Sequence, residues 1–201
     1  MSNSMPDVSR ETSEKLRAFA AMVEKWTARI NLISKSSIPE IWERHILDSA
    51  QLFRHAPSEG RWVDLGSGGG FPGIVSAILA EEFGDVYEFV FVESDQRKCV
   101  FLRTALRELG LLGNVQNERI EALAPQNADI ISARALADLP KLLGLAVPHM
   151  NLGGVALLQK GHNWKAEVQA AQLDWSFEAE PIASQTEPGA VILKIKDIQH
   201  V

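Results

Sequence analysis

The stretch VDLGSGGGFPG, residues 63–73, places five glycines within eight residues at the end of a short apolar run. Glycine brings no side chain to a core and loses much backbone entropy on folding, so this cluster needs another explanation. A glycine-rich loop lets the backbone approach a ligand closely. The stretch therefore predicts a ligand site at the end of a strand.

Short apolar segments alternate with helical segments from residue 61 onward. Strands are predicted at 62–65, 86–93, 114–119, 128–133, 154–160, 176–182 and 190–196, with helices from Pro72 to about Glu82 and from Asp95 to Leu109. This alternation predicts an α/β fold, with a parallel sheet of about seven strands covered by helices on both faces. Ligands of such sheets bind beyond the carboxyl ends of the strands, where the glycine loop falls.

The segment before the predicted sheet, residues 1–58, is predicted to be mainly helical. Apolar residues at helical spacing predict one helix over residues 9–28, and Pro39 fits the first turn of a second helix. We expect residues 1–58 to form an N-terminal helical cap that belongs to the same fold unit as residues 59–201.

Composition limits the class of protein. A chain of 201 residues with a net charge of -6 is expected to form one domain without a broadly basic surface, so any polyanion must meet a local cluster of cations. No apolar run is long enough to span a membrane, and no signal peptide is recognisable at the N-terminus. Cys99 is the only cysteine, which excludes an intrachain disulfide and a cysteine-based metal site. We expect a cytoplasmic protein without a metal, in which Cys99 is a small core residue.

Glycine-rich loops of this kind bind three classes of ligand: a nucleotide phosphate in a P-loop, a dinucleotide, or S-adenosylmethionine. A P-loop is excluded, because no Lys-Ser or Lys-Thr follows the glycines. A dinucleotide fingerprint is matched, but Asp64 lies just before the first glycine, where its carboxylate would repel a pyrophosphate. That carboxylate suits the ammonium group of S-adenosylmethionine, directly or through water. Glu93 ends the second strand and can accept the ribose hydroxyls of either cofactor. We favour S-adenosylmethionine, with a purely structural turn as the alternative.

Four stretches of the chain resemble the GidB/RsmG family of bacterial methyltransferases that act on small-subunit ribosomal RNA. They are WTARINLIS (26–34) with ERHILDS (43–49), the glycine loop, SARAL (132–136) and LLQKG (157–161). The resemblance implies a Rossmann-like, S-adenosylmethionine-dependent methyltransferase domain over residues 59–201. It also implies methylation of guanine N7 in the decoding-region loop of 16S ribosomal RNA, presented as RNA or as a precursor of the small subunit. One departure is that Leu136 stands where the family has an aromatic residue.

The resemblance adds cofactor-binding positions at Gly66, Phe71, Arg134 and the Ile120–Glu121 backbone. The full predicted cofactor set is Asp64, Gly66, Gly68, Phe71, Glu93, Ile120, Glu121 and Arg134. Two other interpretations of Phe71 stay open: its ring stacks on the substrate base, or it packs at the start of the helix.

Guanine N7 carries a lone pair and no proton, so no general base is required, only alignment and exclusion of water. The chain has no Asn/Asp-Pro-Pro motif after the fourth strand for an amine acceptor, and Cys99 is misplaced to serve as a nucleophile. We therefore expect no acid–base catalyst. Arg134 and Lys160 follow predicted strands and are candidates for positioning the base, unless they only cap the strand ends.

The predicted RNA-binding residues are Arg29, Asn31, Arg44, His45 and Lys160. His45 falls on the apolar stripe of its helix, which also fits a core histidine hydrogen-bonded by Asp48. Two other functions stay open: methylation of a small molecule, and a non-catalytic nucleotide-binding regulatory module. We expect a monomer.

Overall fold

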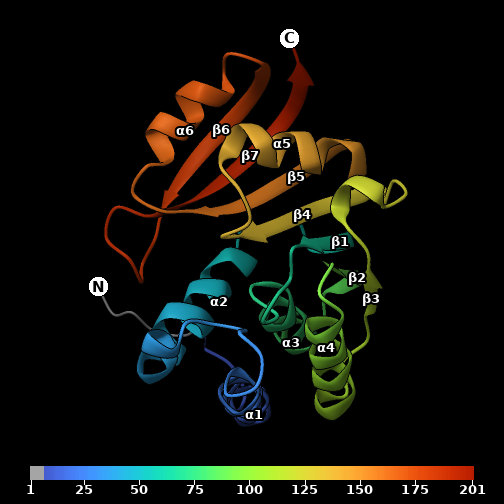
Figure 1. Ribbon diagram of the computed structural model, residues 1–201, viewed down its shortest axis with the longest axis vertical. Coiled ribbons are helices and arrows are strands. Elements are labelled where there is room, and N and C mark those ends of the chain that lie inside the picture. The colour runs from blue at the N-terminus through green and yellow to red at the C-terminus, as the bar shows by residue number, and fades with distance from the viewer. Residues whose placement is uncertain (1–6) are drawn as a thin grey trace.

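The computed structural model describes residues 7–201, which form one seven-stranded sheet with helices on both faces (Figure 1). The strand order is β3-β2-β1-β4-β5-β7-β6. The strands are β1 (Glu59–Leu65), β2 (Val86–Glu93), β3 (Asn114–Asn117), β4 (Ala128–Arg134), β5 (Met150–Lys160), β6 (Trp175–Ala183) and β7 (Val191–His200). The strand order reverses between β1 and β4, so the glycine loop that follows β1 lies at the topological switch point.

The predicted Rossmann-like fold with seven strands is confirmed, but the prediction of a parallel sheet is wrong for the last strand. β7 runs antiparallel to both β5 and β6. The connection from β6 to β7 spans only residues 184–190. A parallel crossover needs a dozen residues or more, so this short connection forces a hairpin, and β7 inserts between β5 and β6.

Residues of β1 alternate between the two faces of the sheet. Trp62 is fully buried on the face of the sheet whose core also contains residues of α1 (Arg10–Thr27), α3 (Gly73–Phe83) and α4 (Gln96–Leu109). Val63 is fully buried on the other face, whose core contains residues of α5 (Leu139–Ala146) and α6 (Trp164–Ala171). Because successive side chains of a strand point to opposite faces, the side chain of Asp64 lies on the α3 side with Trp62.

The N-terminal helix α1 is joined to α3 by polar contacts near its start. Ser9 caps α1 by accepting a hydrogen bond from the Thr12 amide, and its own amide donates to Glu82 of α3 at 2.9 Å. Lys15 forms an ion pair with Glu81 of α3 at 2.5 Å. The division of the chain at residue 58 stays a prediction, although these contacts are those of a cap that packs on the main domain.

The second predicted helix differs from expectation. Instead of one helix from Pro39, the chain forms the 3₁₀ segment η1 (Lys35–Glu40), the π-helical segment η2 (Trp42–Leu47) and α2 (Asp48–Phe53). In the wider π turn the amide of Asp48 bonds to the carbonyl of Glu43, while the carbonyl of Arg44 accepts from the Arg134 side chain at 3.2 Å. A tertiary contact thus takes a carbonyl that a regular helix would use internally.

Candidate functional site

Three glycines of the loop after β1 adopt left-handed backbone conformations, with φ of +66° at Gly66, +51° at Gly68 and +84° at Gly70. A Cβ atom at Gly70 would lie 2.7 Å from Ile74, so this glycine permits close packing. At Gly68 the nearest atoms would be 3.6 Å or more away, and one of them is the Glu93 carboxylate. Gly68 therefore presents its backbone to open space.

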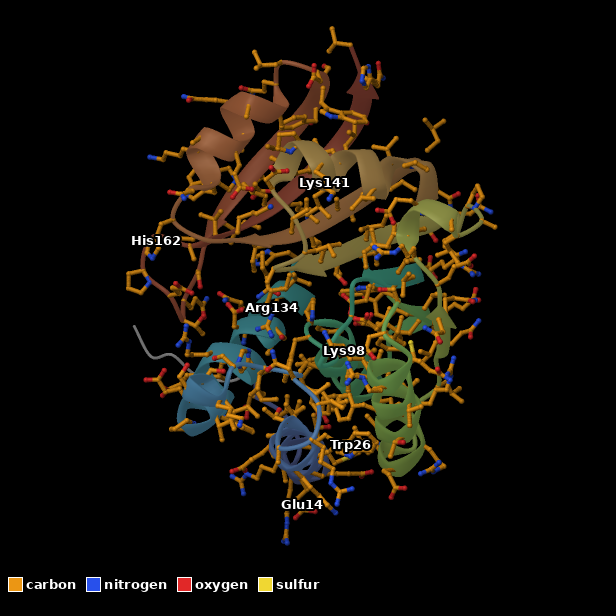
Figure 2. The ribbon with its side chains drawn as sticks, viewed as in Figure 1. Glu14, Trp26, Lys98, Arg134, Lys141 and His162 are labelled. Atoms are coloured by element: carbon orange, nitrogen blue, oxygen red, sulfur yellow. The ribbon has the colours of Figure 1, made fainter. Side chains whose placement is uncertain are left out.

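That space is a cavity of about 360 Å³ at the carboxyl ends of β1, β2 and β4, which we call the loop cavity. Predicted cofactor-binding residues in its wall are Gly66, Gly68, Glu93, Ile120 and Glu121. Lys98 and Lys141 also line it (Figure 2). They were not predicted as cofactor-binding residues, since the sequence does not distinguish them from solvated lysines on a helix. The structure brings these predicted residues together, while their binding of a cofactor stays a prediction.

Glu93 is held in place by two backbone amides. Its Oε2 accepts a hydrogen bond from Gly68 at 3.0 Å, and its Oε1 accepts one from Asp95 at 2.8 Å. The side chain ends β2 and lines the loop cavity. Each carboxylate oxygen has two lone pairs, so the fixed carboxylate can still accept hydrogen bonds from a ligand diol.

Asp64 is 1% exposed and does not line the loop cavity. Its Oδ1 accepts from the Ser132 hydroxyl at 2.6 Å, and that hydroxyl accepts from the Trp62 indole at 2.8 Å. Its Oδ2 has no hydrogen-bond partner among residues 7–201 and lies close to Gly73. Burial raises the pKa of Asp64 to about 6, against the opposing effect of the Ser132 hydrogen bond. The carboxylate is buried beside the loop and outside the cavity wall. A hydrogen bond to a cofactor ammonium would therefore have to pass through a water molecule.

Phe71 is also buried, at 4% exposure. Its ring lies 5.1 Å from the His45 ring and 5.2 Å from the Phe19 ring, measured between centroids. The guanidinium carbon of Arg134 lies 4.9 Å from the Phe71 centroid. The buried ring fits the interpretation in which Phe71 packs at the helix start, while a contact with a cofactor or a base stays a prediction.

A second cavity, of about 410 Å³, lies between the N-terminal helices and the ends of β4, β5 and β7; we call it the cap cavity. It is lined by residues that include Leu32, Arg44, His45, Asp48, Arg134, Gln159 and Lys160. Ala135 lines both cavities and has a left-handed φ of +51°, a feature that its sequence does not signal. The two cavities therefore meet at the residue that follows β4.

Arg134 projects from the end of β4 towards the N-terminal helices (Figure 2). Its Nη1 lies 3.6 Å from Asp48 Oδ2, and both side chains are 18% exposed. Asp48 also accepts from Gln51 at 2.8 Å, from Thr186 at 2.9 Å and from Gln159. Burial raises the pKa of Asp48, and the Arg134 charge opposes that rise. Asp48 and Gln159 lie in the quoted ERHILDS and LLQKG stretches, yet their joint role was not predicted.

The prediction that Asp48 hydrogen-bonds His45 is wrong, because Asp48 faces Arg134, Gln159 and Thr186 instead. The Nε2 of His45 lies 3.1 Å from the Ser37 hydroxyl, and its Nδ1 has no partner within residues 7–201. Burial, followed by the charges of Arg134 and Arg44, lowers the pKa of His45 to about 3. His45 is thus a neutral, half-buried side chain in the wall of the cap cavity.

Lys160 borders the cap cavity, but its charge is already neutralised. Its Nζ donates to Glu167 of α6 at 2.7 Å and to the Ala137 carbonyl at 2.7 Å, with the side chain only 6% exposed. Glu167 also accepts from the Leu139 amide at 2.9 Å. This is the strand-capping alternative, and it does not support the expectation that Lys160 contacts the base or phosphates.

The other predicted RNA-binding residues are accessible. Arg29, Asn31 and Arg44 are exposed, and Arg44 lies 3.6 Å from Glu40. Cys99 is buried, as predicted, and its thiol contacts the Glu93 carbonyl. Across residues 7–201 no group of three or more His, Cys, Asp or Glu side chains is arranged to hold a metal. In the same residues, no helix has the length and apolar character needed to cross a membrane.

Solved structures with the same arrangement confirm the fold. The TYW2 protein of M. jannaschii in complex with AdoMet superposes with a TM-score of 0.57 at 13% identity, covering 87% of this chain and 80% of that one. Ribosomal protein L11 methylase from Lactobacillus delbrueckii subsp. bulgaricus superposes with a TM-score of 0.60 at 15% identity, covering 76% of this chain and 78% of that one.

Sequence comparisons are more specific. The model of the GidB family, described as rRNA small subunit methyltransferase G, matches residues 12–188. A protein named ribosomal RNA small subunit methyltransferase G from Ruegeria pomeroyi is 55% identical over 97% of this chain and 96% of its own length. The protein of the same name from Paramagnetospirillum magneticum is 45% identical over 96% of this chain and 92% of its own length. The chain therefore belongs to the GidB family of ribosomal RNA small subunit methyltransferases.

Proposed function

We propose that this protein transfers a methyl group from S-adenosylmethionine to N7 of a guanine in the decoding-region loop of 16S ribosomal RNA. The observation that carries the proposal is the meeting of two cavities at Ala135. One is walled by a glycine loop and a fixed carboxylate, and the other by arginines and a neutral histidine. A cofactor in the first and a base in the second would lie side by side. Membership of the family supports both the reaction and the RNA substrate.

The loop cavity offers a fixed carboxylate acceptor and open backbone, which suit S-adenosylmethionine. Glu93 would accept the two ribose hydroxyls, since its oxygens are oriented by backbone amides but keep free lone pairs. The open backbone at Gly68 leaves room for the methionine part. The Ile120–Glu121 backbone would border the adenine. The orphaned Oδ2 of Asp64, behind the loop, supports a water-mediated rather than a direct role for that carboxylate.

The cofactor supplies an electrophilic methyl group, and the chain has to orient the acceptor and exclude water. Guanine N7 needs no base to remove a proton, so the lack of a free acid–base pair in the cap cavity fits this acceptor. Methylation leaves a positive charge on the guanine. His45 is uncharged at neutral pH, and Asp48 balances Arg134, so the cavity wall does not oppose that charge strongly. Arg134 and Phe71 would act by shaping the cavity.

Exposed cations support an RNA substrate rather than a small molecule. Arg29 lies in the turn after α1 and Arg44 lies on η2, both outside the loop cavity, and a small-molecule methyltransferase would not need them. They could neutralise phosphates of a larger substrate in spite of the net charge of -6. A non-catalytic regulatory module would need the loop cavity but not the cap cavity.

The test is transfer of a labelled methyl group. The protein should methylate unmodified small-subunit RNA or precursor particles, and should leave free guanosine unmodified at equal base concentration. Efficient methylation of guanosine would establish the small-molecule alternative. Cofactor binding without transfer to RNA, particles or guanosine would establish the regulatory module.

A further inference from the structure

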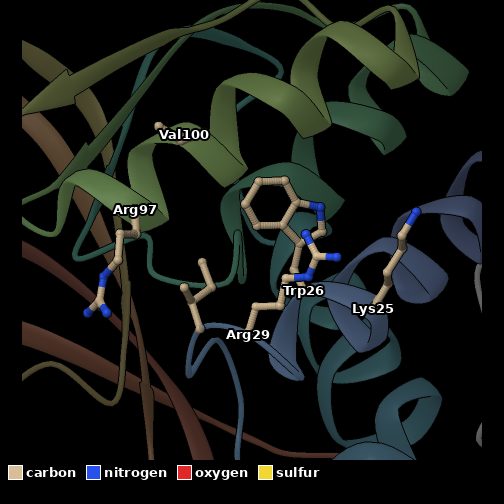
Figure 3. A pocket seen from close by; sticks show the side chains of 6 residues that line it. Lys25, Trp26, Arg29, Arg97 and Val100 are labelled. Carbon is tan, nitrogen blue, oxygen red and sulfur yellow. The ribbon is translucent and has the colours of Figure 1, made fainter.

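A third cavity, of about 400 Å³, lies between the end of α1 and the first turns of α4 (Figure 3). We call it the α1–α4 groove. It is lined by Lys25, Trp26, Arg29, Ile30, Arg97 and Val100. The established family and the two other cavities do not account for it, and the inference drawn from it rests on the proposed RNA substrate.

The groove combines an apolar floor with a cationic rim. The Trp26 indole lies beside α4, fixed by an edge contact with Phe101 at 5.5 Å between centroids (Figure 3). Val100 is 46% exposed although it is apolar. An aromatic face and an exposed aliphatic side chain form a surface on which a nucleobase can lie.

The rim cations are available to a ligand. Within residues 7–201, neither Lys25 nor Arg29 makes a salt bridge. Arg97 pairs with Asp95 at 2.8 Å, but its side chain remains 72% exposed. Three cations around an apolar floor complement a phosphate–base unit, because the phosphates can lie on the rim while the base enters the groove.

Both walls of the groove contain residues that are close in sequence to residues of the two reaction cavities. Arg97 lines the groove, and the next residue, Lys98, lines the loop cavity. Ile30 lines the groove, and Leu32 lines the cap cavity. A Cβ atom at Gly69 would lie 3.2 Å from the Leu32 carbonyl, so Leu32 packs against the glycine loop. An RNA strand that leaves the cap cavity over residues 30–32 would reach the groove.

We propose that the α1–α4 groove binds an unpaired nucleotide of the substrate RNA that lies near the target guanine in the same strand. Its base lies against Trp26 and Val100, and its flanking phosphates contact Lys25, Arg29 and Arg97. This contact contributes to RNA affinity and not to the methyl transfer itself, since no groove residue lines either reaction cavity.

The experiment compares two double variants with the same change in net charge. Lys25→Glu with Arg29→Glu alters the rim, while Lys165→Glu with Lys196→Glu alters exposed lysines on α6 and β7. Binding of labelled, protein-free small-subunit RNA is measured by anisotropy, and KM and kcat are measured for the same RNA. We expect the rim variant to raise Kd and KM about tenfold or more, with kcat and cofactor affinity unchanged. The control should raise them less than about threefold, through the long-range field alone.

A second pair tests the base contact without altering charge. Trp26→Phe keeps an aromatic ring against Phe101 but reduces the stacking area, whereas Trp164→Phe makes the same change on α6. RNA affinity should fall a few-fold only for Trp26→Phe. Equal effects of the rim and control charge variants would overturn the proposal. So would a defect restricted to ribosomal particles, which would indicate a protein partner in the groove. If the wild type binds RNA through the groove but methylates none, the proposed reaction fails while the groove stands.

Discussion

Arg134 lies over the ring of Phe71, with its guanidinium carbon 4.9 Å from the ring centroid and its Nη1 3.6 Å from Asp48. This relationship joins three parts of the chain, namely the end of β4, the glycine loop and the N-terminal helices. The Phe71 ring packs against one side of the guanidinium, and the Asp48 carboxylate balances the guanidinium charge. The cap cavity therefore owes its shape to contacts between segments that are remote in sequence.

The Asp48–Arg134 pair should stabilise the fold more than an exposed pair of the same length. Asp48→Asn leaves a partly buried guanidinium without its counter-charge, so we expect the free energy of unfolding to fall by about 1–3 kcal/mol. Glu40→Gln is the matched control, because Glu40 also lies 3.6 Å from an arginine but both side chains are more than half exposed. Its cost should be below about 1 kcal/mol. Denaturant unfolding of both variants measures the difference, and equal costs would contradict the structural role of Asp48.

Glu93 should be needed for cofactor affinity. Glu93→Ala removes a carboxylate that is held beside the loop cavity by Gly68 and Asp95, and we expect binding of S-adenosylmethionine to weaken by about 1.5–3 kcal/mol. Glu88→Ala, on the same strand but paired with Arg61 on the surface, should leave it unchanged. Isothermal titration calorimetry measures both affinities. Unchanged affinity in Glu93→Ala would remove Glu93 from the cofactor site.

Gly68 and Gly84 separate backbone strain from obstruction of the ligand. Both have positive φ, +51° and +70°, so alanine strains both positions by about 1–2 kcal/mol. Only Gly68 faces the loop cavity, while Gly84 ends α3 in open space. We expect similar losses of stability, but a loss of cofactor affinity only in Gly68→Ala. Full affinity in a folded Gly68→Ala variant would show that the loop is a structural turn.

Asp64 should make stability depend on pH. Its pKa rises from 3.8 to about 6 on folding, so the folded state binds the proton more tightly than the unfolded state. The resulting stabilisation is complete below about pH 4 and is lost as the pH rises through about 6. It amounts to about 3 kcal/mol at most, at 1.36 kcal/mol per pKa unit. Asp64→Asn keeps an acceptor for Ser132 and should remove this dependence. Parallel pH profiles of the two proteins would show that Asp64 does not titrate in this way.

Local patterns in the sequence predicted five residues that line the loop cavity, but not its lysines Lys98 and Lys141, and they did not predict the contacts of the cap cavity. The glycine loop and the acidic end of β2 are adjacent to their own strands, and strand order alone brings them together. Lys160 could not be placed, because its partner Glu167 lies on a helix that has to fold back over the sheet. Asp48 accepts a hydrogen bond from Thr186, which lies 138 residues later in the sequence. Thr186 is in the turn between β6 and β7, and these strands were predicted to belong to a parallel sheet. The alternation of strands and helices does not specify such pairings.

The proposed methyl transfer is best tested by locating the methyl group in the RNA. Unmodified small-subunit RNA or precursor particles are incubated with the protein and the cofactor, and the RNA is then cleaved chemically at N7-methylguanine and sequenced. We expect one new cleavage site, at a guanine in the decoding-region loop, that is lost with Glu93→Ala and retained with Glu88→Ala. Methylation at another atom, at another nucleotide class, or at many unrelated guanines would contradict it.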